Sequence, residues 1–81
     1  MKVHVQFFSR LKDIAGVSEL ELEVPSGTTV EDLLGKLYAQ TPVLREWDST
    51  ILIGAGLEFV RRNYVLQPDE HIAIMPPVQG G

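Results

Sequence analysis

Cysteine is absent from this chain of 81 residues, and histidine occurs only twice. Without cysteine there can be no disulfide and no thiolate metal site, so stability must come from the hydrophobic core. The two histidines, His4 and His71, do not make a convincing zinc site by themselves. The sequence therefore predicts a domain with no metal site, and its composition suits a reducing compartment.

Basic residues are few and scattered. Seven lysines and arginines stand against eleven acidic residues, which gives a formal net charge of −4. Neither nucleic acid nor an anionic membrane would attract such a chain electrostatically, so we expect neither as a partner. The first residues lack the apolar run of a signal peptide, and no stretch approaches transmembrane length. We therefore expect a cytoplasmic protein.

Catalytic motifs are also lacking. The chain has no Walker-type phosphate loop, no GxSxG and no HExxH, and its serines have no visible His-acid partnership. The GAG at residues 54–56 is predicted to be a turn between strands rather than a dinucleotide site. Arg61 and Arg62 are expected at a solvated strand end rather than in an anion site. The sequence therefore predicts a protein that is not an enzyme on its own.

The hydrophobic pattern, by contrast, is informative. Residues 2–8 and 18–24 alternate between apolar and polar side chains, which predicts two half-buried strands. Residues 9–16 have helical spacing and end on a glycine suited to closing a short helix. Further short strands are expected at residues 51–53, 57–61 and 71–75.

The clearest helix is predicted to start at residue 28 and to end at Pro42. Thr28 is expected to be its N-cap, with Glu31 three residues later completing a capping box. One apolar stripe should face the core: Val30, Leu33, Leu34, Leu37 and Tyr38. A single helix laid across one face of a mixed sheet would bury this stripe, so residues 1–81 are expected to form one α+β domain.

The sequence ends on MPPVQGG, which predicts a slender C-terminal tail over residues 76–81. Pro76 and Pro77 should stiffen its base, and Val78 and Gln79 lead to the side-chain-free Gly80 and Gly81. Six extended residues reach roughly 20 Å, enough to deliver the final carboxylate into another protein's active site. Because a free carboxylate is unreactive, a partner would first have to activate it, for example as an acyl-adenylate.

Two large apolar residues near this tail fall at positions where strand alternation predicts exposure. Phe8 shares the outward parity of the first strand, and Met75 shares that of the last. Exposed apolar residues grouped near a functional segment often mark an interface. We therefore expect both to contribute to docking, the alternative being that a second small cluster covers them.

Three segments carry a resemblance to a known family: FFSRLKDIAG, VPSGTTVEDLL and LQPDEHIAIMPPVQGG. They resemble the small, sulfur-carrier subunit of molybdopterin synthase, and the ending PPV-x-GG is the most specific part. The resemblance implies a ubiquitin-like β-grasp fold, with the first and last strands adjacent in a mixed sheet. It also implies docking positions at Phe8, Phe59 and Met75. The role of Phe59 rests on the resemblance alone.

The resemblance further implies a reaction sequence at Gly81. A ubiquitin-activating-like adenylyltransferase and sulfurtransferase would consume ATP to adenylate Gly81 and then convert it to a thiocarboxylate. The tail would enter the large subunit of molybdopterin synthase, in an expected heterotetramer. There sulfur would pass to cyclic pyranopterin monophosphate for molybdenum cofactor biosynthesis. The domain itself would bind no cofactor.

Other functions stay open from the sequence. The chain could carry sulfur for thiamine or cysteine biosynthesis, or act as a ubiquitin-like protein modifier, or be a β-grasp interaction domain whose tail has no role. Two turns depart from the family pattern, with Gly56 in place of the usual Asn and Asp69-Glu70 in place of Gly-Asp. Aspartate tolerates left-handed turn geometry, so the fold is expected to survive.

Overall fold

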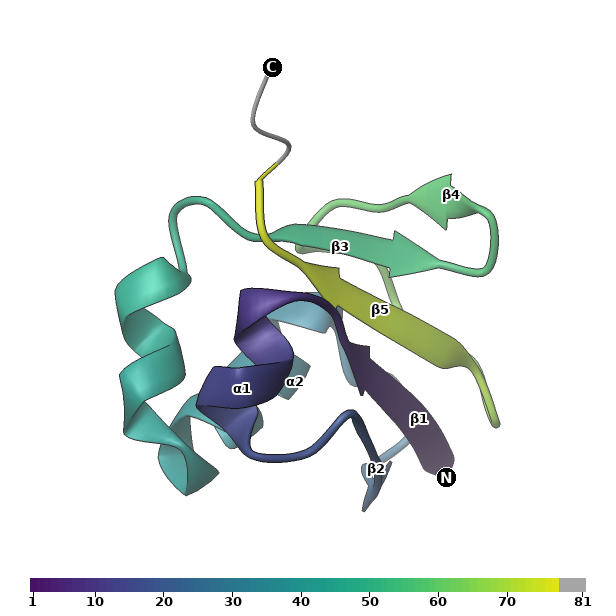
Figure 1. Cartoon of the computed structure of the whole chain (residues 1–81). Coiled ribbons are helices and arrows are strands. Elements are labelled where there is room, and N and C mark those ends of the chain that lie inside the picture. The colour runs from purple at the N-terminus through teal and green to yellow at the C-terminus, as the bar shows by residue number, and fades with distance from the viewer. Residues whose placement is uncertain (78–81) are drawn as a thin grey trace.

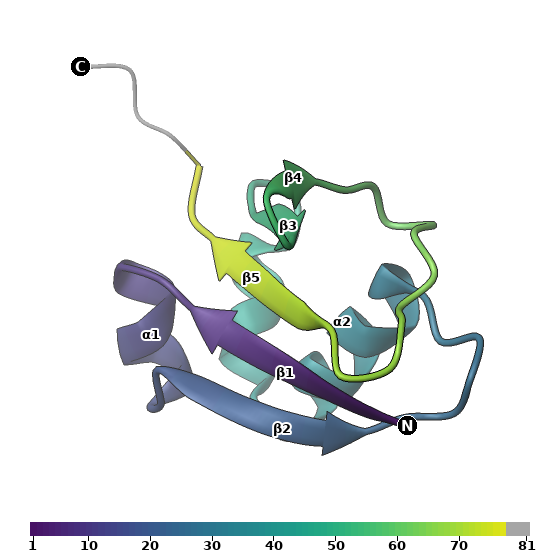
Figure 2. The same cartoon turned by 90° about the vertical axis from the view of Figure 1, so that its right-hand side faces the viewer.

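Five strands form one mixed sheet in the computed structural model, which describes residues 1–77. The strands are β1 (Lys2–Phe7), β2 (Glu19–Glu23), β3 (Leu52–Ala55), β4 (Glu58–Phe59) and β5 (His71–Met75). Their order across the sheet is β2-β1-β5-β3-β4 (Figures 1 and 2). The β1–β5 pair is parallel, and the other pairs are antiparallel. The expected adjacency of the first and last strands is confirmed.

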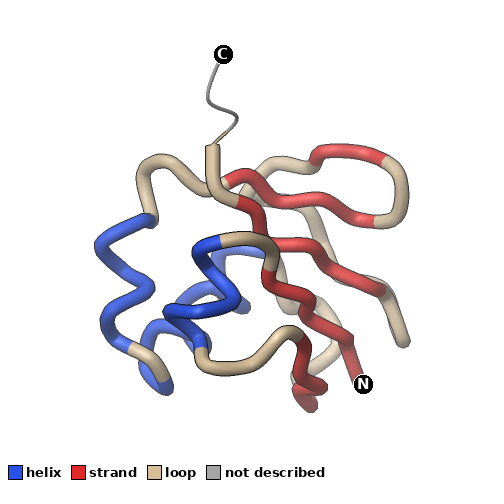
Figure 3. The backbone as a smooth tube through the Cα atoms, in the orientation of Figure 1, coloured by secondary structure: helices blue, strands red, loops and turns tan. Residues whose placement is uncertain are grey.

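The helical segments all lie on one face of this sheet (Figures 2 and 3). They are α1 (Arg10–Ala15), α2 (Val30–Gln40) and the 3₁₀ helix η1 (Pro42–Trp47). α1 ends at Gly16, whose φ of 83° lies in the left-handed region that favours glycine. Within residues 1–77, no helix is long and apolar enough to span a membrane. The described chain is therefore the expected α+β arrangement, with α2 as its main helix.

The N-terminus of α2 differs from the prediction by one residue. Thr29, not Thr28, is the N-cap, and its hydroxyl accepts a hydrogen bond from the backbone N–H of Asp32 at 3.2 Å. The Asp32 carboxylate in turn accepts from the Thr29 N–H, so Asp32 replaces Glu31 in the capping box. Thr28 is buried and donates its hydroxyl to the carbonyl of Pro25 at 2.7 Å. The prediction was wrong because two adjacent threonines each precede an acidic residue by three positions.

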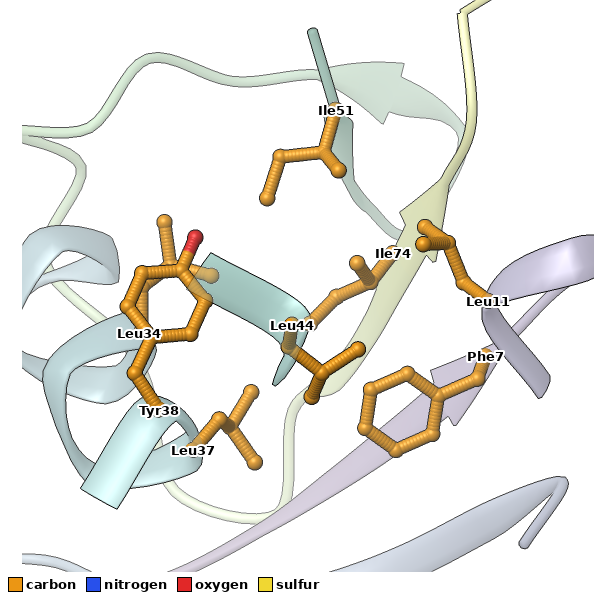
Figure 4. Close-up of a pocket in the computed structure, with 8 residues that line it drawn as sticks. All are labelled: Phe7, Leu11, Leu34, Leu37, Tyr38, Leu44, Ile51 and Ile74. Carbon is orange, nitrogen blue, oxygen red and sulfur yellow. The ribbon is translucent and has the colours of Figure 1, made fainter. Parts of the chain in front are cut away.

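The core lies between the sheet and these helices. The predicted α2 stripe is buried, and so are the inward residues of β1, which are Val3, Val5 and Phe7. A small apolar pocket remains where α1, α2 and η1 meet the sheet (Figure 4). It is lined by Phe7, Leu11, Leu34, Leu37, Tyr38, Leu44, Ile51 and Ile74. Packing of this kind supplies the stability of a domain without disulfides.

Two segments of the middle of the chain differ from the prediction. The GAG stretch is not wholly a turn, because Gly54 and Ala55 belong to β3 and the turn consists of Gly56 and Leu57. Gly56 adopts a φ of 63° there. The stretch after Pro42, predicted only as a variable connection, forms η1 and buries Leu44. No hydrophobic period marks so short a helix, because 3₁₀ segments rarely extend beyond a few residues.

Candidate functional site

One face of the sheet is left without a helix in the described part of the chain, and the predicted docking residues lie on it. Alternation turns Val5, Phe7, Ile72 and Ile74 into the core. It turns the intervening residues of β1 and β5 to the opposite side, which we call the outer face. The apolar end of the outer face, formed by Phe8, Phe59 and Met75, is called the docking face below.

Phe8 directly follows β1 and lies beside β5. Its backbone N–H donates to the carbonyl of Ile74 at 3.1 Å, which extends the parallel pairing by one residue. Its side chain is 39% exposed, whereas that of Phe7 is 3% exposed. The predicted exposure of Phe8 is therefore confirmed, and the two adjacent phenylalanines point to opposite sides of the sheet.

Phe59 lies on the same face, although its parity could not be read from the sequence. In the antiparallel β3–β4 pair, Phe59 is directly opposite Gly54, and Gly54 is opposite Ala73 of β5. Residues opposite each other in a sheet point to the same side, so all three belong to the outer face. Phe59 is 68% exposed. Leu57, fully exposed at the β3–β4 turn, was not predicted as a site residue.

Met75 is half-buried rather than exposed. It is paired with Leu52 of β3, and its side chain passes close to Gly54, where a Cβ would lie 3.3 Å from the Met75 Cε. The absence of a side chain at Gly54 leaves room for Met75 to lie against the sheet. Alternation gives the direction of a side chain but not the cover that a neighbouring strand provides, so the sequence could not show this.

The chain leaves the sheet beside this docking face. Pro76 and Pro77 follow Met75 and line a groove together with Ser9, Arg10 and Trp47. The Arg10 guanidinium lies 5.4 Å from the centre of the Trp47 ring, a cation–π distance. The other predicted tail residues, Val78, Gln79, Gly80 and Gly81, lie outside the residues that the structure describes.

The two histidines come together at the opposite end of the outer face. His4 and His71 are paired across the parallel β1–β5 strands, and their rings stack with centroids 4.6 Å apart. The Nδ1 of His4 lies 3.7 Å from the Glu21 carboxylate. Across residues 1–77, no group of three or more His, Cys, Asp or Glu side chains is placed to hold a metal ion. His71 is exposed, as predicted for a surface histidine, while His4 is half-buried.

Arg62 was predicted to be solvated at a strand end, but it lies outside any strand and binds Asp48. Its Nη1 donates to Asp48 Oδ1 at 2.7 Å, and its Nη2 donates to the Asp48 carbonyl. The Tyr38 hydroxyl donates to the same Oδ1 at 2.5 Å. The Tyr38 and Arg62 hydrogen bonds hold the pKa of Asp48 below its usual range, while burial and then the bond to Asp48 raise the pKa of Tyr38. These contacts tie α2 and η1 to the loop before β5.

Comparison with known proteins agrees with this fold. The sequence pattern described as the ThiS family matches residues 5–81. The chain is 31% identical to the molybdopterin synthase sulfur carrier subunit of Arabidopsis thaliana, covering all of this chain and 84% of that protein.

Two solved structures were similar over almost their full lengths. A protein from Pyrococcus furiosus, assigned as molybdopterin converting factor subunit 1, gives a TM-score of 0.88 at 28% identity over 96% of this chain and 99% of that one. The small archaeal modifier protein 1 of Methanosarcina acetivorans gives a TM-score of 0.80 at 30% identity, over 99% of this chain and 96% of that one. The molecule is thus a ubiquitin-like β-grasp domain. Within that class, the chain belongs to the ThiS family.

Proposed function

We propose that this chain is the sulfur-carrier subunit of molybdopterin synthase, acting in the cytoplasm. The relatives from A. thaliana and P. furiosus support this assignment by name and by similarity over most of their lengths. The structural observation that carries it is the place at which Pro76 and Pro77 leave the sheet. β5 ends between Phe8 and β3 on the docking face and runs directly into Pro76 and Pro77. A protein that binds the docking face is therefore positioned to receive the segment that follows.

The reactive group in this proposal is the carboxylate of Gly81. A carboxylate oxygen attacks the α-phosphorus of ATP in the active site of an adenylating partner, and pyrophosphate leaves. A sulfur nucleophile at the sulfide oxidation level then attacks the acyl carbon of the adenylate, and AMP leaves, which gives a thiocarboxylate. Glycine at this position leaves the carbonyl carbon sterically open to attack. The chain supplies the acyl group, and the partner supplies the catalytic residues.

Sulfur delivery takes place in the large synthase subunit, with which this chain assembles. The thiocarboxylate sulfur forms a bond to a carbon of cyclic pyranopterin monophosphate. Water then attacks the Gly81 acyl carbon and breaks its bond to that sulfur, which returns Gly81 as a carboxylate that can be loaded again. The docking face gives the large subunit a fixed point, because Phe8 and Met75 are held by the central strands of the sheet. A rigid apolar contact beside a tail limits the positions that its end can reach, which favours productive insertion.

Reconstitution tests the proposal directly. The purified chain is mixed with ATP, an activating enzyme, sulfide, the large synthase subunit and cyclic pyranopterin monophosphate, and dithiolene product is measured. We expect product with the full chain and none after deletion of Gly81. Unchanged product formation by the shortened chain would overturn the proposal. Thermal unfolding of both chains is the control, and we expect equal midpoints because Gly81 comes six positions after the end of β5 in the sequence.

A second candidate is a ubiquitin-like protein modifier, which the likeness to the small archaeal modifier protein 1 favours. Both functions begin with the same adenylate at Gly81 and differ in the nucleophile that attacks it. Intact-mass measurement on the chain from native cells separates them. Replacement of a terminal oxygen by sulfur supports the sulfur carrier. Amide conjugates to lysine side chains without any thiocarboxylate would support the modifier instead.

A further inference from the structure

Gly54 is unusual because it lies inside a strand without any backbone need for glycine. Its φ is not positive, unlike those of Gly16, Gly27 and Gly56. Glycine weakens a strand interior, and its presence often marks a close approach by another group. A Cβ at Gly54 would lie 3.3 Å from Met75 Cε, 3.6 Å from the Glu58 carbonyl oxygen and 3.7 Å from Ala73 Cβ. The space above Gly54 is thus already bordered by its neighbours on three sides.

The consequence is a hollow in the outer face. It lies over β5, β3 and β4, which are neighbours in the sheet (Figure 2). Gly54 and Ala73 are paired across β3 and β5 and form its floor. Met75, Phe59 and Leu57 form its walls. Two small residues side by side, surrounded by three large apolar ones, create a depression where a row of ordinary strand residues would form a flat surface.

We propose that this hollow is a socket for one large apolar side chain of the large synthase subunit, and that Gly54 sets its depth. This socket rests on the proposed function, and it identifies the part of the docking face where the contact with the large subunit is concentrated. Interface energy is usually concentrated in a few large side chains that fill pockets on the partner. The docking face would then bind the large subunit mainly through one inserted side chain, rather than through contact between two flat apolar surfaces.

The position and the apolar lining of the hollow define its occupant. Met75 is both a wall of the hollow and the last residue before Pro76, so a protein that encloses the tail must pass over it. The floor and walls are apolar, which calls for an apolar side chain. Glu58 borders the hollow through its backbone carbonyl. Its side chain belongs to the other face of the sheet, because Glu58 pairs with Ala55, which pairs with Ile72 of the core.

Filling the hollow tests the socket. Gly54→Leu and Gly54→Ala are compared with the unchanged chain by calorimetric titration against the purified large synthase subunit. We expect Gly54→Leu to raise Kd by about tenfold or more, and Gly54→Ala to raise it by a smaller factor, because the added atoms occupy the space of the inserted side chain. Gly35→Ala is the matched control. Gly35 lies on the exposed side of α2, where an added Cβ meets nothing within 4 Å, so Kd should not change.

The direction of the effect separates a socket from a flat patch. On a flat patch, Gly54→Leu adds apolar contact area and leaves Kd unchanged or lowers it, and either result would overturn the inference. Thermal unfolding checks that each variant folds. If Gly54→Leu does not fold, Gly54→Ala decides, because only the mobile end of Met75 has to shift to admit a Cβ.

The same titrations separate the socket from the proposed function. Failure of the unchanged chain to bind the large subunit would refute the proposed function and the inference together. Binding of the unchanged chain that is insensitive to Gly54 would refute the socket alone.

Discussion

At the scale of single residues, Phe7 and Phe8 show how neighbours in the sequence can have separate roles. The two rings belong to opposite faces of the same sheet, with exposures of 3% and 39%. One ring therefore contributes to the free energy of unfolding, and the other is available to a partner. A pair of substitutions can measure these contributions independently, because the backbone and the residue type are the same.

We expect Phe8→Ala to raise the Kd for the large synthase subunit by about tenfold or more, while lowering the free energy of unfolding by about 1 kcal/mol or less. Phe7→Ala should instead cost about 3–5 kcal/mol of stability, since it empties a core site. Calorimetric binding and urea unfolding measure the two effects. A loss of stability from Phe8→Ala as large as that from Phe7→Ala would mean that Phe8 is part of the core.

The hydrogen bonds of Asp48 with Tyr38 and Arg62 predict that the stability of the fold decreases at acidic pH. The Tyr38 hydroxyl, and secondly Arg62, lower the pKa of Asp48 in the folded protein. A carboxyl group with a lowered folded pKa adds stability above its unfolded pKa of about 3.9, and that stability is lost as pH falls through the folded pKa. We expect Asp48→Asn to cost about 1 kcal/mol at pH 7, a modest value because the side chain is 42% exposed.

The measurement is urea unfolding of the original chain and of Asp48→Asn at pH 7 and near pH 2. The difference between them should shrink on acidification, because protonated Asp48 no longer accepts these bonds as a charged group. Tyr38→Phe should weaken the same acid dependence, since its hydroxyl is the largest cause of the shift. A constant difference between Asp48 and its variant at all pH values would contradict this account.

At the scale of elements, the strongest hydrophobic periods predicted the structure well. The alternation in β1 and β2 and the α2 stripe depend on local spacing alone, and the structure confirms them. The elements and contacts that were missed depend on distant partners. The half-burial of Met75 depends on Gly54, the face of Phe59 depends on the β3–β4 register, and the environment of Arg62 depends on Asp48. No local pattern encodes these pairings.

The cap of α2 offers a test at the same scale. Thr29→Ala should lower the free energy of unfolding by about 1 kcal/mol, because the Asp32 N–H loses its hydrogen-bond acceptor. Thr29→Ser should restore most of that stability, since serine caps at least as well. Thermal unfolding of the original chain, Thr29→Ala and Thr29→Ser measures both effects on stability. An unaffected midpoint for Thr29→Ala would indicate that Thr28 caps the helix, as the sequence alone suggested.

At the scale of the whole molecule, the sheet is completed by a strand from the far end of the sequence. β5 lies between β1 and β3 and hydrogen-bonds to both, with His4 opposite His71 and Ile53 opposite Ile74. We expect a chain ended at Glu70 to remain unfolded, because β1 and β3 would each lose a neighbour and the core would lose Ile72 and Ile74. Circular dichroism and the dispersion of amide NMR signals measure this. A cooperative thermal transition in the shortened chain would contradict it.

The central position of β5 links the synthesis of the chain to the formation of its docking face. Contacts between residues so distant along the chain form slowly, and they cannot form until β5 has left the ribosome. A partially made or prematurely terminated chain thus lacks an assembled docking face, since Met75 and the β5 backbone beside Phe8 are missing from it. In the proposed function, such fragments would therefore not occupy the large synthase subunit in place of complete chains. Because β5 is both central in the sheet and last in the sequence, only a complete chain would present the docking face to a partner.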